Sequence, residues 1–327
     1  MHTVELLFKH FFTAIEGPTQ SSNKLQSDSV YNLIGKIQVD PTKDLDNNEI
    51  LELPNPTLSL ALMKCLLYND EKSQKKLLRD DQMCLLVWTA KVTGIDIPAS
   101  LKKFFSYKQE QHGFARWITS ATGYLRIYCS VSGTTEQINL QQKMNLKLIC
   151  EFIVAVYTPS WMDNFYRPSA PEGPQCVLNL RDHLLDAADF YDIPLGVIIR
   201  LKKIFIQYAK TWLCTENLAL SVYSKENDLT LEVVKNRNIM VSQTDLCKRL
   251  WDKNCQLVDF LTSETQNAPC LNENDFDFWN KTMSSNISCE RYVRKMKIIL
   301  VNNQLRETLD IKSRIKRMIN LNDYLKF

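Results

Sequence analysis

The chain has 327 residues, of which 45% are hydrophobic and 24% charged, a balance typical of a folded protein and not of a disordered one. Only 8 residues are glycine, fewer than half of the ~7% found in average proteins. Doubly wound folds, β-sandwiches and propellers need glycine in turns and phosphate loops. We therefore expect an all-α protein, built as a multi-helix stack or an irregular α-solenoid of helical hairpins.

The charge is uneven along the chain. Residues 291–327 contain ten lysines and arginines against three acidic residues, whereas the remaining body is mildly acidic. The ten cysteines include no CxxC pair, so reduced thiols are expected in place of disulfides or a zinc site. Lys9 and His10 interrupt the first apolar run, which argues against a signal peptide, and no uncharged apolar stretch is long enough to span a membrane. We expect an intracellular protein, cytoplasmic or nuclear.

The first third of the chain is predicted to be helical. Apolar residues at helical spacing indicate helices over 4–15, 57–68 and 83–92. The second of these is expected to bury Leu58, Leu62, Cys65 and Leu66. Residues 30–39 fit a helix or a strand equally well.

Further helices are predicted over 114–130, with a bend at Gly123, and over 138–157, ending before Pro159. A short similarity links two regions: Asp-Ile-Pro at 96–98 is followed by Leu-Lys-Lys at 101–103, and Asp-Ile-Pro at 192–194 by Leu-Lys-Lys at 201–203. This is either a structural repeat of helical hairpins or a coincidence.

The clearest break is residues 167–174, with three prolines and a glycine. We predict an N-terminal helical half over 1–166 and a C-terminal helical half over 175–327. The break is either a linker between two domains or a loop within one continuous domain.

The strongest helical pattern lies in 180–212, which is predicted to form a hairpin broken at 191–194. In its second arm we expect Leu201, Phe205 and Tyr208 to be buried. Ile199 and Ile206 form a second apolar edge that is expected to contact another neighbour. Arg200 and Lys203 are expected to be exposed.

The carboxyl-terminal region is less regular. Residues 229–241 fit a short β-hairpin or a helix. A helix is predicted over 245–261, and a long basic helical segment over 290–320.

Signatures of catalysis are missing from the sequence. There are 4 histidines, and no HExxH, GxSxG, GxxxxGK[ST] or GxGxxG motif occurs. The best candidate for chemistry is the set Asp182, His183, Asp186 and Asp189. It is either a solvated helix face, a divalent-metal site that lacks a second ligand-bearing helix, or an acidic face pairing with Arg200 and Lys203. The solvated face is favoured, and we expect no enzyme activity, cofactor or metal.

Two basic stretches bear on nucleic-acid binding. In the first, cationic residues are interleaved with aromatic ones. The aromatic residues stand at the spacing of a helix core, which favours a packing role for them. The residues of this stretch are Lys102, Lys103, Phe104, Phe105, Tyr107, Lys108, Arg116 and Trp117. The second is the carboxyl-terminal segment, whose contact residues for a protein partner or nucleic acid would be Arg291, Arg294, Lys295, Lys297, Lys312, Arg314, Lys316 and Arg317.

The sequence thus favours a non-enzymatic adaptor or scaffold subunit that binds other proteins through a helical surface. The alternative is a nucleic-acid-associated factor that uses the basic segment 291–317.

Overall fold

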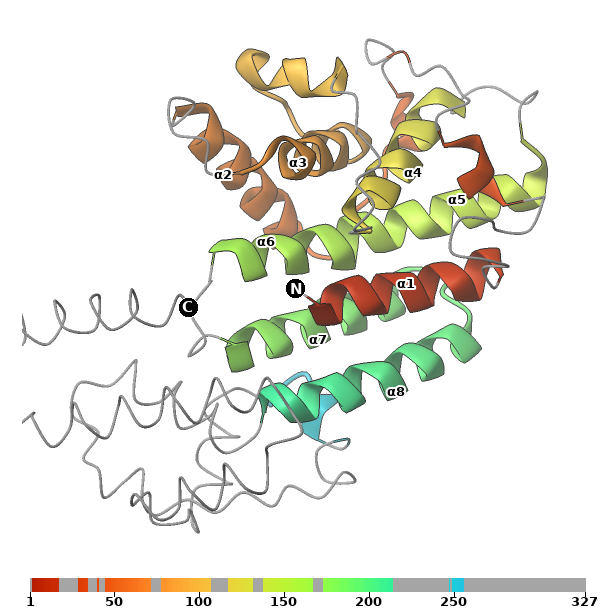
Figure 1. The fold of residues 1–327 in the computed structure, drawn as a ribbon, viewed down its shortest axis with the longest axis vertical. Coiled ribbons are helices and arrows are strands. Elements are labelled where there is room, and N and C mark those ends of the chain that lie inside the picture. Colours follow the sequence, from red (N-terminus) through yellow and green to blue (C-terminus); the bar gives the residue numbers. More distant parts are fainter. Residues whose placement is uncertain are drawn as a thin grey trace, which may run out of the picture. The chain divides into compact units, whose positions relative to one another are not determined.

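The structure is a computed structural model, and it describes residues 2–17, 29–34, 40, 45–71, 78–106, 117–131, 138–166, 173–213, 247 and 249–255. Within these ranges the chain forms eight α-helices, three 3-10 helices, one π-helical turn and no strand (Figure 1). The prediction of an all-α fold is confirmed. Residues 229–241, where a β-hairpin was the alternative to a helix, lie outside the described ranges.

The α-helices are α1 (His2–Glu16), α2 (Pro56–Glu71), α3 (Asp80–Val92), α4 (Ile118–Val131), α5 (Leu140–Phe152), α6 (Thr158–Tyr166), α7 (Gly173–Phe190) and α8 (Leu195–Trp212). The shorter elements are η1 (Val30–Leu33), η2 (Asn47–Glu49), η3 (Ala99–Ser106) and the π-helical turn η4 (Ile153–Tyr157).

The chain divides into two compact units, one of residues 1–166 and 179–205 and the other of residues 167–178 and 206–327. The two predicted halves, 1–166 and 175–327, stay a prediction. The site described below belongs to the first unit.

The centre of the first unit is α3. Every residue from Gln82 to Ala90 is buried, and the helix contacts α2, α4, α6 and η3. A helix that is covered on all sides must be apolar all round, and α3 has this character in Met-Cys-Leu-Leu-Val-Trp at 83–88.

A second part of the core is aromatic and lies under α1, which packs against α5 and η4. The rings of Phe11 and Phe152 stack with their centroids 3.9 Å apart, and Phe8 lies 4.7 Å from Tyr157. These contacts explain why the apolar side of the predicted helix over 4–15 is buried.

The helix predicted to end before Pro159 continues through it, because α5, η4 and α6 follow one another without a break. Pro159 cannot donate a backbone hydrogen bond, and in a regular α-helix its ring would collide with the carbonyl group four residues earlier, that of Ala155. The π-helical turn directly before Pro159 is wider, and the N–H of Thr158 donates to the carbonyl of Ile153, five residues back. This wider turn relieves the collision.

The two similar segments, 96–103 and 192–203, form different kinds of helix. After Pro98 the chain forms the 3-10 helix η3, with the N–H of Leu101 donating to the Pro98 carbonyl at 3.0 Å. After Pro194 it forms the regular helix α8, in which the Pro194 carbonyl accepts from Val197 and Ile198. In both segments a helix therefore begins after the proline, but the two helices are of different types.

Most of the expectations for α8 are met. Leu201, Phe205 and Ile206 are buried, Arg200 and Lys203 are exposed, and Tyr208 is half-buried, so the expectation of a fully buried Tyr208 is wrong. Ile199 is 46% exposed, and the contact of Ile199 and Ile206 with a second neighbour stays a prediction.

Two long-range contacts attach this hairpin to the rest of the first unit. The hydroxyl of Tyr191 donates to the carbonyl of Glu52 at 2.6 Å. The guanidinium of Arg200 lies 3.3 Å from Nδ1 of His10 on α1.

Candidate functional site

The acidic residues predicted on the hairpin lie on α7, and one of them, Asp182, pairs with the residue beside it. Arg181 is only 1% exposed, and its Nη2 lies 2.6 Å from Oδ1 of Asp182. Asp186 is half-buried and Asp189 exposed. Arg200 of α8, which was one predicted partner of this acidic face, contacts His10 of α1 instead.

His183 contacts a carboxylate from a different helix. Its Nε2 lies 3.6 Å from Oδ2 of Asp163 on α6, and the same oxygen accepts a hydrogen bond from Nδ2 of Asn179 at 2.9 Å. Within the described ranges, no three His, Cys, Asp or Glu side chains gather closely enough to hold a metal ion. The arrangement connects α6 to α7, and we assign it a packing role.

The first basic stretch divides into a surface part and a core part. Lys102 and Lys103 are exposed on η3. Phe105 is buried, with its ring 4.8 Å from that of Trp88 in an edge-to-face contact. The ring of Trp117 packs on Phe8 and Phe12, so these two aromatic residues serve the core as expected. Tyr107, Lys108 and Arg116 lie outside the described ranges, as do all eight residues assigned to the basic segment 291–317.

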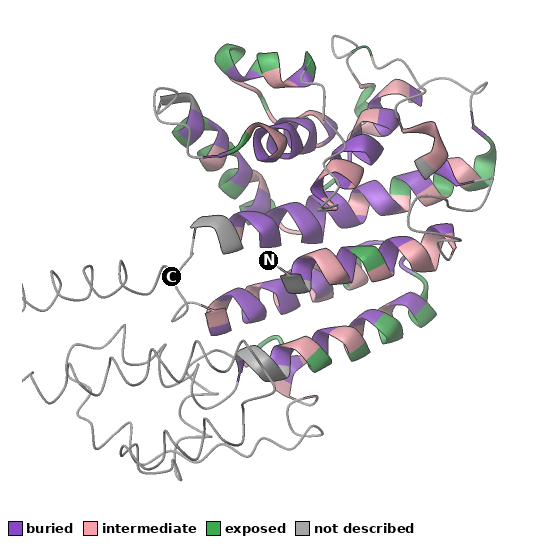
Figure 2. Cartoon of the chain, in the orientation of Figure 1, coloured by how far each residue is buried: buried purple, intermediate pink, exposed green. Residues whose placement is uncertain are grey.

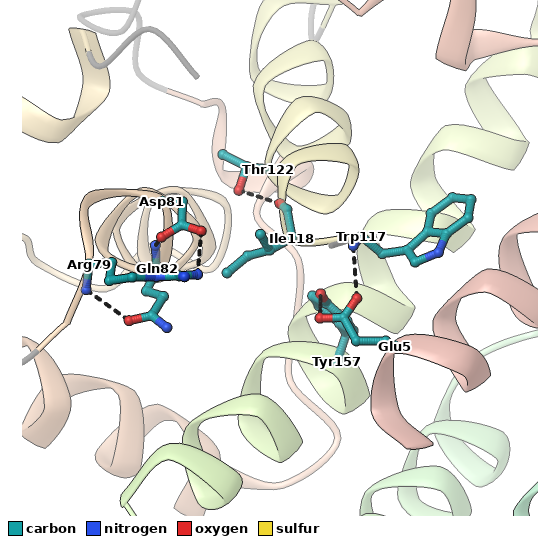
Figure 3. A network of polar contacts seen from close by, with 8 residues as sticks. All are labelled: Glu5, Arg79, Asp81, Gln82, Trp117, Ile118, Thr122 and Tyr157. Atoms are coloured by element: carbon teal, nitrogen blue, oxygen red, sulfur yellow. Dashed lines mark hydrogen bonds and ion pairs between the residues drawn. The ribbon is translucent and has the colours of Figure 1, made fainter. Parts of the chain in front are cut away.

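A polar network inside the first unit also has a structural role (Figure 3). Glu5 of α1 accepts a hydrogen bond from the backbone N–H of Trp117 at 2.8 Å and another from the hydroxyl of Tyr157 at 3.0 Å. Trp117 directly precedes α4, and its carbonyl accepts from Ala121. The carboxylate of Glu5 therefore caps the start of α4, where a negative charge is favourable.

The start of α3 is capped in a similar way. The backbone N–H of Arg79 donates to Oε1 of Gln82 at 2.8 Å, and the Arg79 guanidinium pairs with Asp81 at 2.7 Å (Figure 3). These contacts fix the ends of the two helices.

Two buried thiols are held in the protonated form. Burial raises the pKa of Cys84 to about 12, and its Sγ donates to the carbonyl of Phe104 at 3.3 Å. Burial also raises the pKa of Cys150 well above its ordinary value. Because the thiolate is the nucleophilic form, neither cysteine is suited to nucleophilic catalysis.

The most distinctive surface feature is on α2, which contacts α3 and η3. Leu58, Leu62 and Leu66 are buried there, as predicted for three of the four inner residues, while Cys65 is half-buried. The opposite side of the same helix is also apolar. It carries Leu60, Met63, Leu67 and Tyr68, which are between 40% and 55% exposed.

We call these four residues, together with Lys64, the α2 outer face. Leu60, Met63 and Leu67 stand at positions i, i+3 and i+7, so they line up along one side of the helix. In Figure 2 this side of α2 shows exposed residues. Single exposed apolar residues are ordinary, whereas a contiguous group marks an interaction surface.

Smaller apolar groups occur elsewhere on the described surface. Leu140 and Met144 are exposed at the start of α5, and Phe190, Leu195 and Ile199 are exposed around the turn between α7 and α8. The α2 outer face is the largest such group on a single helix in the described residues.

No family model, curated protein or solved structure matches the chain. Function is therefore inferred from this chain's own residues. Among the described helices, none is both long and apolar enough to cross a membrane.

Sequence reasoning did not identify the α2 outer face, although a signal for it exists. Six of the ten residues from Leu58 to Leu67 are leucine or methionine, and they fall on both sides of the helix. A helix that is apolar all round is usually buried all round. An edge position for such a helix is visible only in the structure.

Proposed function

We propose that this protein is a non-enzymatic adaptor or scaffold subunit that binds other proteins through the α2 outer face. The observation that carries the proposal is the row of half-exposed Leu60, Met63, Leu67 and Tyr68 on a helix that already has a buried side. The polar side chains described above, Glu5, Gln82 and Asp163, serve helix caps and helix–helix contacts, which supports binding over catalysis.

The size of the face indicates reversible binding. Completing the burial of four half-exposed large apolar side chains contributes about 1 kcal/mol each. Association costs on the order of 4–15 kcal/mol, so these four contacts alone give weak binding. A partner must therefore add further contacts around the face.

An intracellular location, cytoplasmic or nuclear, is part of the same proposal. The described cysteines, which include Cys65 on α2, are thiols that form no disulfide, and reduced thiols are typical of reducing compartments.

The test is affinity capture with the full-length chain from the cells that make it. Three forms are compared: wild type, Leu67→Asp on the α2 outer face, and the matched control Leu140→Asp, at a position that is 75% exposed on α5. We expect the amount of captured protein to fall at least tenfold with Leu67→Asp and to stay unchanged with Leu140→Asp. Equal capture by all three forms would overturn it.

The alternative function, nucleic-acid association, rests on the excess of ten basic over three acidic residues in 291–327. Phosphate contacts would make binding fall steeply with salt. Full-length chain is compared with a variant in which Lys312, Arg314, Lys316 and Arg317 are changed to glutamine. RNA or DNA binding that is equal in both forms would rule this alternative out.

A further inference from the structure

The exposed side of helix α8, together with the turn before it, carries opposite charges at its two ends. Leu195, Ile199 and Lys203 are all exposed and stand four residues apart, so they form one row along the helix (Figure 2). Asp192 is exposed in the turn, three residues before Leu195. We call these four residues, which all belong to the first unit, the α8 stripe. It runs from an acidic residue through two apolar residues to a basic one.

Neighbouring elements add negative charge at the acidic end. Asp189 at the end of α7 is exposed, and so is Glu52, whose carbonyl accepts the hydrogen bond that fastens the turn. Burial raises the pKa of Glu151 on α5, and the charge of Asp192 also raises it, so these two carboxyl groups lie near each other. Lys147 lies 3.7 Å from Glu151 and offsets one of these charges. Negative charge therefore prevails at this end of the stripe.

The basic end is reinforced by α1. Arg200 is exposed, and its Nη2 lies 3.3 Å from Nδ1 of His10, beside which Lys9 is also exposed. Burial lowers the pKa of His10, and the charges of Arg200 and Lys9 lower it further, so both cations lie close to it. Helix α8 itself contains no acidic residue. These two cations and Lys203 place positive charge at this end.

The acidic residues of the two neighbouring helices are less exposed than these cations. On α7, Asp182 pairs with Arg181 at 2.6 Å, and Asp186 is half-buried. On α1, Glu5 is half-buried and Glu16 is buried. The exposed charge at this end of the stripe is therefore positive.

A surface with opposite charges at its two ends is complementary to itself. A two-fold axis through the middle of the stripe makes the α8 helices of two copies antiparallel, and the acidic end of each copy then lies on the basic end of the other. The midpoint between Asp192 and Lys203 falls at residues 197–198, and that between Leu195 and Ile199 falls at residue 197. One axis therefore brings the ion pairs and the apolar residues together at the same time.

Charge disfavours two other occupants. The chain's own segment 291–327 is basic, with ten lysines and arginines against three acidic residues, so it would be repelled by Lys203. An anionic membrane surface would be repelled by Asp192. Like charges that face each other across an interface suppress both arrangements, whereas a second copy offers the opposite charge at both ends.

We propose that two copies of this chain associate through the α8 stripe, with the two α8 helices antiparallel. Leu195 and Ile199 of both copies pack around the two-fold axis, and Asp192 of each copy pairs with Lys203 of the other. This surface is separate from the α2 outer face, so the association goes beyond the proposed function. Because the stripe is small and its ion pairs are exposed, the dimer is weak and depends on concentration.

The test is sedimentation of the full-length chain over a series of concentrations. The variants are Asp192→Lys, Lys203→Asp, the combination of these two, and Ile199→Asp. The matched control is Lys103→Asp, at an exposed lysine on η3. Circular dichroism checks that each variant is folded, since every substituted side chain is exposed.

Each single charge reversal sets like charges opposite each other at two places, so we expect the association constant to fall about fivefold or more. The combined reversal restores opposite charges and should return most of the lost affinity. An equimolar mixture of Asp192→Lys and Lys203→Asp should associate more tightly than either variant alone, for the same reason. Ile199→Asp places two carboxylates at the axis and should weaken the dimer about tenfold or more, and Lys103→Asp should have no effect.

Each other outcome overturns part or all of the proposal. A chain that remains monomeric up to about 1 mM, or a dimer that Ile199→Asp leaves unchanged, overturns the role of the α8 stripe. A dimer that needs Ile199 but is not restored by the combined reversal overturns the antiparallel arrangement. Leu67→Asp separates this surface from the α2 outer face, because a dimer that this substitution dissociates lies on α2 and overturns the proposal.

Discussion

Gly123 offers a test of the packing of the first unit. It lies inside α4, and a Cβ atom at this position would be 2.9 Å from both Cδ1 and Cγ2 of Ile34. Rotation about χ2 moves only the Cδ1 atom, and the χ1 angle of a β-branched side chain is stiff. The clash is therefore relieved only if the backbone at the end of η1 moves.

Gly196 is the matched control, because it is also helical, in the first turn of α8, and nothing lies within 4 Å of a Cβ atom there. Both glycines belong to the first unit, so both report on the same folded body. Alanine at Gly196 should raise the free energy of unfolding by about 0.5–1 kcal/mol through helix propensity. At Gly123 the same gain is opposed by an overpacking cost of about 1–3 kcal/mol.

The assay is urea denaturation followed by helical circular dichroism. We expect Gly196→Ala to raise the urea midpoint. The free energy of unfolding of Gly123→Ala should be about 1–3 kcal/mol lower than that of Gly196→Ala. Combining Gly123→Ala with Ile34→Ala should remove most of the difference, measured as a coupling energy between the two positions. If Gly123→Ala is as stable as Gly196→Ala, the packing of η1 against α4 described here is wrong.

Two further predictions concern the half-buried carboxylates of Glu5 and Glu151. Glu5→Ala should lower the free energy of unfolding by about 1–3 kcal/mol, because Trp117 and Tyr157 lose their acceptor; Glu5→Gln, which keeps one acceptor oxygen, should cost less in the same urea titration. Burial raises the pKa of Glu151, and Lys147 only partly opposes this. Because the pKa in the folded state lies above that in the unfolded chain, the ionised Glu151 reduces stability as pH rises through this interval. Urea midpoints measured between pH 4 and 7 should fall less with pH in Glu151→Gln than in the wild type, and parallel curves would contradict the assignment.

Local patterns in the sequence were enough to predict the helical class and several helices. The apolar positions of α1 repeat at helical spacing, and the same holds for α8, so Phe11 and Phe205 were correctly placed inside. Proline at 159 was misread as a helix end because the sequence does not show that a π-helical turn precedes it. The residues of this turn are all buried and pack against α1, a contact that periodicity does not encode.

The polar contacts between helices join residues that are far apart in the chain, so local patterns do not predict them. Glu5 and Trp117 are 112 residues apart, and His183 and Asp163 belong to different helices. For α2, periodicity identifies the apolar residues on both sides but not which side meets α3. The exposure of Leu67 follows from the position of α2 at an edge, which is a property of the assembled fold.

A partner protein bound at the α2 outer face would lie within reach of position 67, and site-specific photocrosslinking detects such a partner. A photoreactive phenylalanine analogue is placed at Leu67 in the full-length chain inside cells, and at Leu140 on α5 as the control. We predict a crosslinked adduct with another protein from position 67 and none of the same mass from position 140. No intermolecular adduct from position 67, or the same adducts as from position 140, would show that no partner binds at this face.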